Sequence, residues 1–286
     1  MTEFNGKIDL HMHTTVSDGT DTPEEILEKV KAADIAVFSI TDHDAVKSGE
    51  IIRSILKKDD PLFITGVEFS CKDDEGKYHI LGYGYDTKAQ PINAVVKHGH
   101  YLRIVKLKAR LDFLQKTFGF DFPKEEIDKL SKLDNPGKPH IGNLMVKLGY
   151  AQTKEQAIEE FINKASLKNQ HIGPREAIEG ILASGGIPVL AHPCYGSGDE
   201  LIIGEDLHKR VKKLMDYGLK GLEGYYSGFS EKLSKSVLDL ADKYGLFVTA
   251  GSDYHGTNKM VTLGDTGLDL KSEKNEALML FLESVL

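Results

Sequence analysis

Seven short runs of apolar and β-branched residues recur along the chain, and helical patterns separate most of them. Several runs are almost continuously apolar, which is typical of parallel strands buried on both faces of a sheet. This alternation predicts an α/β fold whose strand count approaches that of a β/α barrel. The runs are Lys7–Leu10, Ile35–Ile40, Leu62–Val67, His79–Tyr85, Ile187–Ala191, Leu219–Glu223 and Leu246–Gly251.

Local signals place some helices and turns between these runs. Thr22, which precedes a proline, is a predicted N-cap, and Glu25 completes a capping box. A second helix is predicted from Ser230 to Gly245, because glycine is the usual residue after the last turn. Only Phe69–Tyr78 separates the third run from the fourth. Because this segment is too short for a crossover helix, we expect these two strands to form a hairpin.

The strand–helix rhythm breaks in the middle of the chain, where the apolar spacing is helical throughout. We therefore expect two parts. Residues 1–90 and 184–286 would form a barrel-like part, and residues 91–183 would form a helical insertion.

Charge and cysteine content exclude some functions. The formal net charge is −8, so the surface as a whole does not attract polyanions, and no long duplex nucleic acid is expected as a partner. Cys71 and Cys194 are far apart and form no CxxC motif, which fits a reducing cytoplasm. No signal-peptide core and no apolar run of membrane-spanning length is found. We expect a cytoplasmic protein with no membrane partner.

Histidines and carboxylates recur where the predicted strands end. In a β/α barrel, the carboxyl ends of the strands converge on one mouth, where the active site lies. A lone histidine there is more often an ordinary hydrogen-bonded residue, but so many titratable groups would be costly to bury without a cation. The residues at these strand ends that could bind a metal are His11, His13, Asp18, Asp42, His43, Asp44, Glu68, His79, His192, Asp253 and His255.

The types and spacing of these residues indicate the kind of metal. His-x-His places two imidazoles on one side of an extended chain, because strand side chains alternate with period two. Imidazoles with carboxylates suit Mn, Fe or Zn better than Ca or Mg. The set exceeds the four ligands that one ion needs, and Glu68 could bridge two ions. We expect two or three divalent transition-metal ions, Mn, Fe or Zn.

Six segments resemble, in order, the successive motifs of the PHP family, which is named for polymerase and histidinol phosphatase. They are HMHTTVSDGT, SITDHDAV, TGVEFS, HILGYGYD, PVLAHP and SDYHG. The resemblance covers essentially the whole chain. GKPHIGNLMVKLGY, in the expected insertion, is similar to the TrpH-like stand-alone metal-dependent phosphoesterases. The resemblance implies a distorted (β/α)7 barrel with a helical insertion domain. It also implies that residues 1–90 and 184–286 form the catalytic barrel and that the insertion, residues 91–183, serves as a substrate-binding cap.

The resemblance also implies how the ligands divide among three ions. One ion would take His11, His13, Glu68 and Asp253, a second Glu68, His79 and His192, and a third Asp18, His43 and His255. Glu68, Asp253 and His192 would be catalytic. We interpret Asp42, Asp44 and Glu223 as residues that orient ligands. Cys71 and Cys194 are interpreted as packing residues, with zinc-binding thiolates as the alternative.

The insertion carries basic residues that could bind the substrate. His100, Arg103, Lys106 and Arg110 are spaced by three, three and four residues and lie on one helix face. A solvated basic face is the alternative interpretation. Lys138 and His140 open the next helix, where N–H groups attract anions. In the resembling subfamily a basic residue and the histidine of such a segment contact substrate phosphate, although arginine is common where this chain has Lys138. The expected substrate-binding residues are Arg103, Arg110, Lys138 and His140.

The function that these features favour is phosphate-ester hydrolysis by metal-activated water, which needs no serine or cysteine nucleophile. The resemblance implies a nucleoside 3',5'-bisphosphate or the 5' end of short RNA as substrate. One alternative is a phosphatase for another small metabolite such as histidinol phosphate. The other is a metal-stabilised binding protein without turnover.

Overall fold

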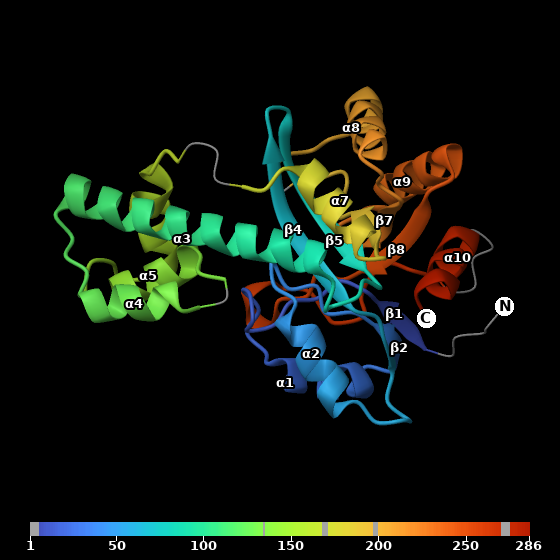
Figure 1. Ribbon diagram of the computed structural model, residues 1–286, viewed down its shortest axis with the longest axis horizontal. Helices are drawn as coiled ribbons and strands as arrows, with labels where there is room; N and C mark the ends of the chain where they lie inside the picture. The colour runs from blue at the N-terminus through green and yellow to red at the C-terminus, as the bar shows by residue number, and fades with distance from the viewer. Residues whose placement is uncertain (1–5, 134, 168–170, 197–199, 270–274) are drawn as a thin grey trace. The chain divides into compact units, whose positions relative to one another are not determined.

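The computed structural model describes residues 6–133, 135–167, 171–196, 200–269 and 275–286. The chain divides into two compact units (Figure 1). The first consists of Met1–Val96 and Ile172–Leu286, and the second is Lys97–His171. Among the described residues, no helix is long and apolar enough to cross a membrane.

The first unit contains two sheets. Parallel strands β1 (Lys7–Asp9), β2 (Ile35–Phe38) and β3 (Leu62–Phe63) form one sheet in the order β1-β2-β3. The other sheet has the order β4-β5-β6-β7-β8. Its strands are β4 (Gly66–Asp73), β5 (Gly76–Tyr83), β6 (Ile187–Leu190), β7 (Gly221–Tyr226) and β8 (Phe247–Gly251). The fold is therefore a mixed α/β fold.

The expected hairpin is confirmed, since β4 and β5 pair antiparallel. Strand β5 is also antiparallel to β6, whereas β6, β7 and β8 run parallel. The start of β5 therefore lies at the same edge of the sheet as the ends of β6–β8. This direction explains why His79, near the start of its strand, can join side chains that follow the ends of other strands.

The prediction of a single strand at Leu62–Val67 is wrong, because this segment is divided between β3 and β4. Gly66 stands at the division, and a side chain there would collide with Ser39 Oγ and the Ile40 carbonyl. Isolated parallel bridges, Met12 to Tyr254 and His43 to Glu68, connect the two sheets. Continuous strand pairing around a closed barrel is not found among the described residues.

Helices cover the sheets of this unit. Helix α1 (Pro23–Ala32) begins with the expected capping box, in which the Glu25 amide donates to Thr22 Oγ1 and the Thr22 amide donates to Glu25 Oε2. Helix α9 (Glu231–Tyr244) begins after Ser230 and ends at Gly245, which is left-handed with φ 61°. The other helices are α2 (Lys47–Ile55), α7 (Pro174–Ala183), α8 (Gly204–Asp216) and α10 (Glu276–Val285). Helix α7 falls in the range expected for the insertion, yet it packs on β4, β5 and β6.

The second unit is helical and has a hydrophobic core of its own. Helix α3 (Gln90–Phe118) leads into it, followed by α4 (Lys124–Ser131), α5 (Lys138–Lys147) and the short α6 (Lys154–Gln156). In this core, Leu107, Leu111 and Leu114 of α3 pack with Ile141 and Met145 of α5. The unit therefore folds around contacts within its own residues.

Candidate metal centre

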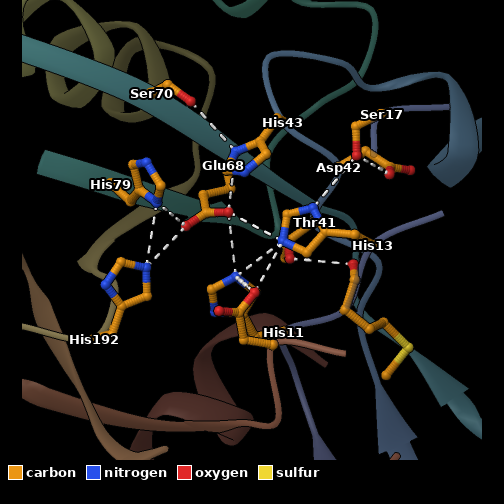
Figure 2. Close-up of polar contacts among 12 residues, drawn as sticks. His11, His13, Ser17, Thr41, Asp42, His43, Glu68, Ser70, His79 and His192 are labelled. Carbon is orange, nitrogen blue, oxygen red and sulfur yellow. Dashed lines mark hydrogen bonds and ion pairs between the residues drawn. The ribbon is translucent and has the colours of Figure 1, made fainter. Parts of the chain in front are cut away.

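His11 and His13 follow the end of β1 and lie beside the loop that follows β8 (Figure 2). The Asp253 amide donates to the His11 carbonyl at 2.8 Å, and the His13 amide donates to the Tyr254 carbonyl at 2.8 Å. The two imidazoles point the same way, with their Nε2 atoms 3.2 Å apart. Asp253 Oδ1 lies 3.5 Å from His11 Nε2 and 3.4 Å from His13 Nε2. Two adjacent strand ends thus bring two imidazoles and a carboxylate to one point.

The Glu68 carboxylate lies buried among histidine rings, with a side chain that is 1% exposed (Figure 2). Each neighbouring imidazole has a nitrogen within 3.4 Å of a Glu68 oxygen. Within the part of the chain that the structure describes, neither oxygen accepts a hydrogen bond of good geometry. The surrounding residues are His11, His13, His43, His79 and His192.

This arrangement fits bound divalent cations. A buried carboxylate without hydrogen bonds is costly, and the lone pairs of neutral imidazoles would repel it. Protonating every ring would instead crowd several positive charges together. A divalent ion accepts the lone pairs and offsets the carboxylate charge at once. The donor set of imidazoles and carboxylates suits transition metals better than Mg or Ca.

The candidate ligand atoms gather in three overlapping groups, within each of which they lie at most 4.8 Å apart. All nine expected ligands lie in or beside these groups. The outlier is His192, whose Nε2 lies 3.4 Å from Glu68 Oε1 and 3.3 Å from His79 Nδ1. The groups are His11 with His13 and Asp253, His43 with Glu68 and His79, and His13 with Asp18, His43 and His255. The division of ligands among ions stays a prediction.

Burial and neighbouring charges spread the pKa values of the cluster. Burial disfavours the charged form of His13, but contacts with Asp253 and Glu68 outweigh it and raise the pKa of His13 to about 9. Burial holds the pKa of His43 well below its usual value. Burial opposes the charged form of Asp253 as well, yet His11 and His13 hold the pKa of that carboxyl well below its usual range. Without a bound cation, burial thus favours the neutral form of His43, whereas neighbouring carboxylates favour the protonated form of His13.

Asp42 supports the loop that carries His13 and Asp18 (Figure 2). Its Oδ1 accepts from the Thr14 amide at 2.7 Å and from Ser17 Oγ at 2.6 Å, and its Oδ2 accepts from Thr14 Oγ1 at 2.7 Å. Both carboxylate oxygens are thus used within the loop. Asp42 holds the ligands in place and does not face the cluster as a ligand.

Glu223, at 0% exposure in β7, links two of the candidate ligands. Its Oε1 lies 2.8 Å from His11 Nδ1, and its Oε2 accepts from the His192 amide at 2.7 Å. A carboxylate facing Nδ1 keeps the proton there, so that Nε2 of His11 presents its lone pair to the group. His192 has φ 27°, a left-handed conformation that is strained for histidine, and the Glu223 contact helps to hold it.

Neither cysteine belongs to the groups of candidate ligand atoms found among the described residues. Burial raises the pKa of the Cys71 thiol well above its usual value and that of Cys194 to about 11. A neutral buried thiol behaves as a small apolar group. These values support the interpretation of both residues as packing residues.

Two residues beside the cluster were not expected from the sequence. Tyr226 donates its hydroxyl to Asp253 Oδ2 at 3.0 Å, and Lys259 Nζ lies 2.5 Å from the same oxygen. Lys259 follows His255 by four residues in SDYHGTNK, and Tyr226 follows Glu223 by three. Their closeness in sequence to His255 and Glu223 could have indicated that they lie near the site. Sequence periodicity, however, does not distinguish a functional lysine in a loop from any other.

The four expected substrate-binding residues all belong to the second unit. Burial lowers the pKa of Arg110, and the nearby Arg103 guanidinium lowers it further, so two positive charges lie close together. Lys138 Nζ donates to Asn163 Oδ1 at 2.6 Å. His140 Nδ1 accepts from the Gly137 amide at 3.2 Å, which assigns this ring a role at the start of α5.

Comparison with known proteins identifies relatives over nearly the whole chain. The sequence profile of the PHP domain family matches residues 9–168. A phosphoribosyl 1,2-cyclic phosphate 1,2-diphosphodiesterase from Eggerthella lenta is 27% identical over 87% of this chain and 94% of its own. A 5'-3' exoribonuclease from Haemophilus influenzae is 26% identical over 92% and 95%. A 3',5'-nucleoside bisphosphate phosphatase from Chromobacterium violaceum is 28% identical over 87% of both chains.

Metal uptake should tighten as pH rises toward about 9, because the proton that His13 holds below its pKa of about 9 must leave before the ring can bind a cation. Titration calorimetry of Mn²⁺ or Zn²⁺ into chelator-treated protein, in two buffers of different ionisation enthalpy, counts the protons released. His13→Gln should release fewer protons. An affinity that stays constant between about pH 6 and pH 9 would contradict the assignment.

Glu223→Gln should weaken metal binding by about ten- to a hundredfold, the usual effect of losing a residue that orients a ligand. A carboxylate accepts at both oxygens, whereas an amide accepts at one end and donates at the other, so glutamine cannot serve both His11 Nδ1–H and the His192 amide. Competition with a chromogenic chelator measures the affinity. Glu231→Gln, on the exposed first turn of α9, is the matched control. Equal affinities in the two variants would show that Glu223 does not orient His11.

Proposed function

The chain belongs to the PHP domain family and is a metal-dependent phosphoesterase, and from this we propose that it hydrolyses small phosphorylated nucleotides. The proposed substrates are nucleoside 3',5'-bisphosphates and the 5' end of short RNA. The proposed cofactors are two or three Mn, Fe or Zn ions. The observation that carries the proposal is the Glu68 carboxylate, buried among imidazoles in an arrangement that a divalent cation would complete.

The roles of the residues follow from their contacts. Bound divalent ions would lower the pKa of water and offset the charge of the phosphate. We propose that the nine ligand residues hold these ions, with Glu68, Asp253 and His192 essential for catalysis. Glu223 and Asp42 would keep the ligands in position through the hydrogen bonds described above. The protein need not supply a nucleophile of its own.

The substrate class is supported by the relatives' names and by the charge of the second unit. Relatives are named as a bisphosphate phosphatase and an exoribonuclease, and both reactions involve a nucleotide. We propose that Arg103, Arg110, Lys138 and His140 bind a second phosphate, because guanidinium groups donate well-matched hydrogen bonds to phosphate oxygens. The relative named as a cyclic-phosphate diesterase makes diester cleavage the second candidate.

Two further proposals concern the architecture of the chain. We infer that the two sheets together correspond to a distorted (β/α)7 barrel, because the bridges at Met12–Tyr254 and His43–Glu68 connect them. We also infer that the helical insertion contributes to substrate binding. Histidinol phosphate is the alternative substrate, and a screen of rates on it and on nucleoside 3',5'-bisphosphates distinguishes the two.

Glu68→Gln should lower kcat by at least about a hundredfold, because it removes the carboxylate that offsets cation charge at the centre of the cluster. Initial rates on p-nitrophenyl phosphate with Mn²⁺ measure the loss, and elemental analysis reports the metal content of each variant. Glu231→Gln, exposed on α9, should leave kcat within the small range of surface substitutions. Normal turnover by Glu68→Gln with its metals bound would refute the role of Glu68.

Arg110→Ala should lower activity on a substrate with two phosphates much more than on a substrate with one. On p-nitrophenyl phosphate, which has one phosphate, turnover should stay near normal. On a nucleoside 3',5'-bisphosphate, kcat/KM should fall by about ten- to a hundredfold, the effect of losing one charge-assisted hydrogen bond. Lys116→Ala, which removes an exposed charge from the same helix, is the control. His140→Ala is a poorer test, because it also removes the contact to the Gly137 amide. Equal losses of kcat/KM on both substrates would mean that Arg110 stabilises the fold and does not bind the second phosphate.

A further inference from the structure

The cavity at the candidate metal centre has a second wall that the metal ligands do not form. The cavity has a volume of about 430 Å³, and one wall consists of histidines with Glu68 and Asp253. The other wall contains Tyr195, Tyr226 and Lys259. Among the described residues that line this cavity, Lys259 is the only lysine or arginine. A permanent positive charge therefore lies next to the ligand cluster.

Asp253 uses its two oxygens for different partners. Its Oδ1 lies 3.4–3.5 Å from nitrogens of His11, His13 and His255 and so faces the ligand cluster. Its Oδ2 accepts from the Tyr226 hydroxyl and contacts Lys259 Nζ. The tyrosine and the lysine thus fix the orientation of a candidate ligand from the side away from the histidines.

Lys259 can donate further hydrogen bonds besides the one to Asp253. Its ammonium carries three N–H donors, and the Asp253 contact occupies one of them. Its side chain is 41% exposed, whereas that of Asp253 is 5% exposed. The ammonium is therefore anchored by a buried carboxylate and still accessible from the cavity. An anchored side chain loses little further conformational entropy when it binds an anion.

We infer that Lys259 binds a non-bridging oxygen of the substrate phosphate and makes the site prefer phosphate monoesters to diesters. Of the two proposed substrates, this favours nucleoside 3',5'-bisphosphates, whose phosphates are monoesters, over the diester linkages of short RNA. A monoester carries nearly two negative charges near neutral pH and a diester carries one, so a fixed ammonium favours the monoester. This inference rests on the proposed function, because it concerns the same cavity. It assigns specificity to a residue of the first unit, independently of the basic residues of the second.

The competing explanation is that Lys259 only positions Asp253. Tyr226→Phe distinguishes the two roles, because it removes the other hydrogen bond to Asp253 Oδ2 and leaves the charge in the cavity unchanged. A purely positioning lysine would give Lys259→Met and Tyr226→Phe the same phenotype. That phenotype would be weaker metal binding and equal losses on every ester.

The test compares two substrates with the same leaving group and different charge, p-nitrophenyl phosphate and bis(p-nitrophenyl) phosphate, using the Mn²⁺-loaded full chain. Lys259→Met should lower kcat/KM for the monoester by about ten- to a hundredfold and for the diester by much less. Tyr226→Phe should affect both esters alike. Lys235→Met, on the exposed face of α9, controls for the loss of one lysine.

A second readout does not depend on turnover. Orthophosphate binding by calorimetry should weaken in Lys259→Met by a similar factor, with the Mn²⁺ content unchanged, and stay near normal in Lys235→Met. Equal losses on the two esters, or unchanged orthophosphate binding, would overturn the inference. If the unmodified chain hydrolyses neither ester with Mn²⁺, Fe²⁺ or Zn²⁺, the proposed function fails, and orthophosphate binding alone then decides the role of Lys259.

Discussion

The site depends on the burial of one negative charge, the Glu68 carboxylate, among histidine rings (Figure 2). Water is excluded there, so the charge must be balanced by groups that the chain brings to it. Histidine rings surround the Glu68 carboxylate, and hydrogen bonds within the neighbouring loops hold those rings in place. The histidines can balance it by taking up protons or by sharing a divalent cation, and these two states compete. This competition links the acid–base properties of the cluster to its metal binding.

Around this charge, buried carboxylates with no role as ligands hold the loops in place. Asp9 accepts from the His11, Ser252 and Gly264 amides and so ties the end of β1 to segments after β8. Burial raises its pKa to about 6 although these hydrogen bonds oppose the shift. Glu223 performs a similar function between His11 and His192. Main-chain amides beside the candidate ligands thus donate to the buried carboxylates of Asp9 and Glu223, which fixes the backbone. Glu223 also contacts the His11 ring and fixes its orientation.

The three groups of candidate ligands overlap, and this overlap has chemical consequences. His13 and His43 each belong to two groups, so a change at either ring affects more than one potential ion. The rings of His13 and His255 are stacked with centroids 4.1 Å apart, which leaves little space for rearrangement. A cluster packed this closely should lose metals together, because removal of one ion leaves shared ligands unbalanced. Lys259 and Tyr226 add a polar wall whose charge can select among phosphate esters.

The residue types of the candidate ligands and their convergence on one site could be predicted from the sequence. The His11-x-His13 and Asp253-x-His255 pairs follow from the period-two alternation of extended chain, and the capping box at Thr22 is equally local. The resemblance to one family gave the proposed reaction, which local patterns could not supply.

Features that depend on segments distant in sequence could not be predicted and are seen in the folded chain alone. An expected strand divides in two at Gly66, where a side chain would collide with Ser39, and the reversed direction of β5 brings His79 to the other candidate ligands. The same holds for the contact of Lys259 with Asp253 and for the bounds of the two units. Sequence periodicity reports which face of an element is buried, but it carries no information about which other element meets that face.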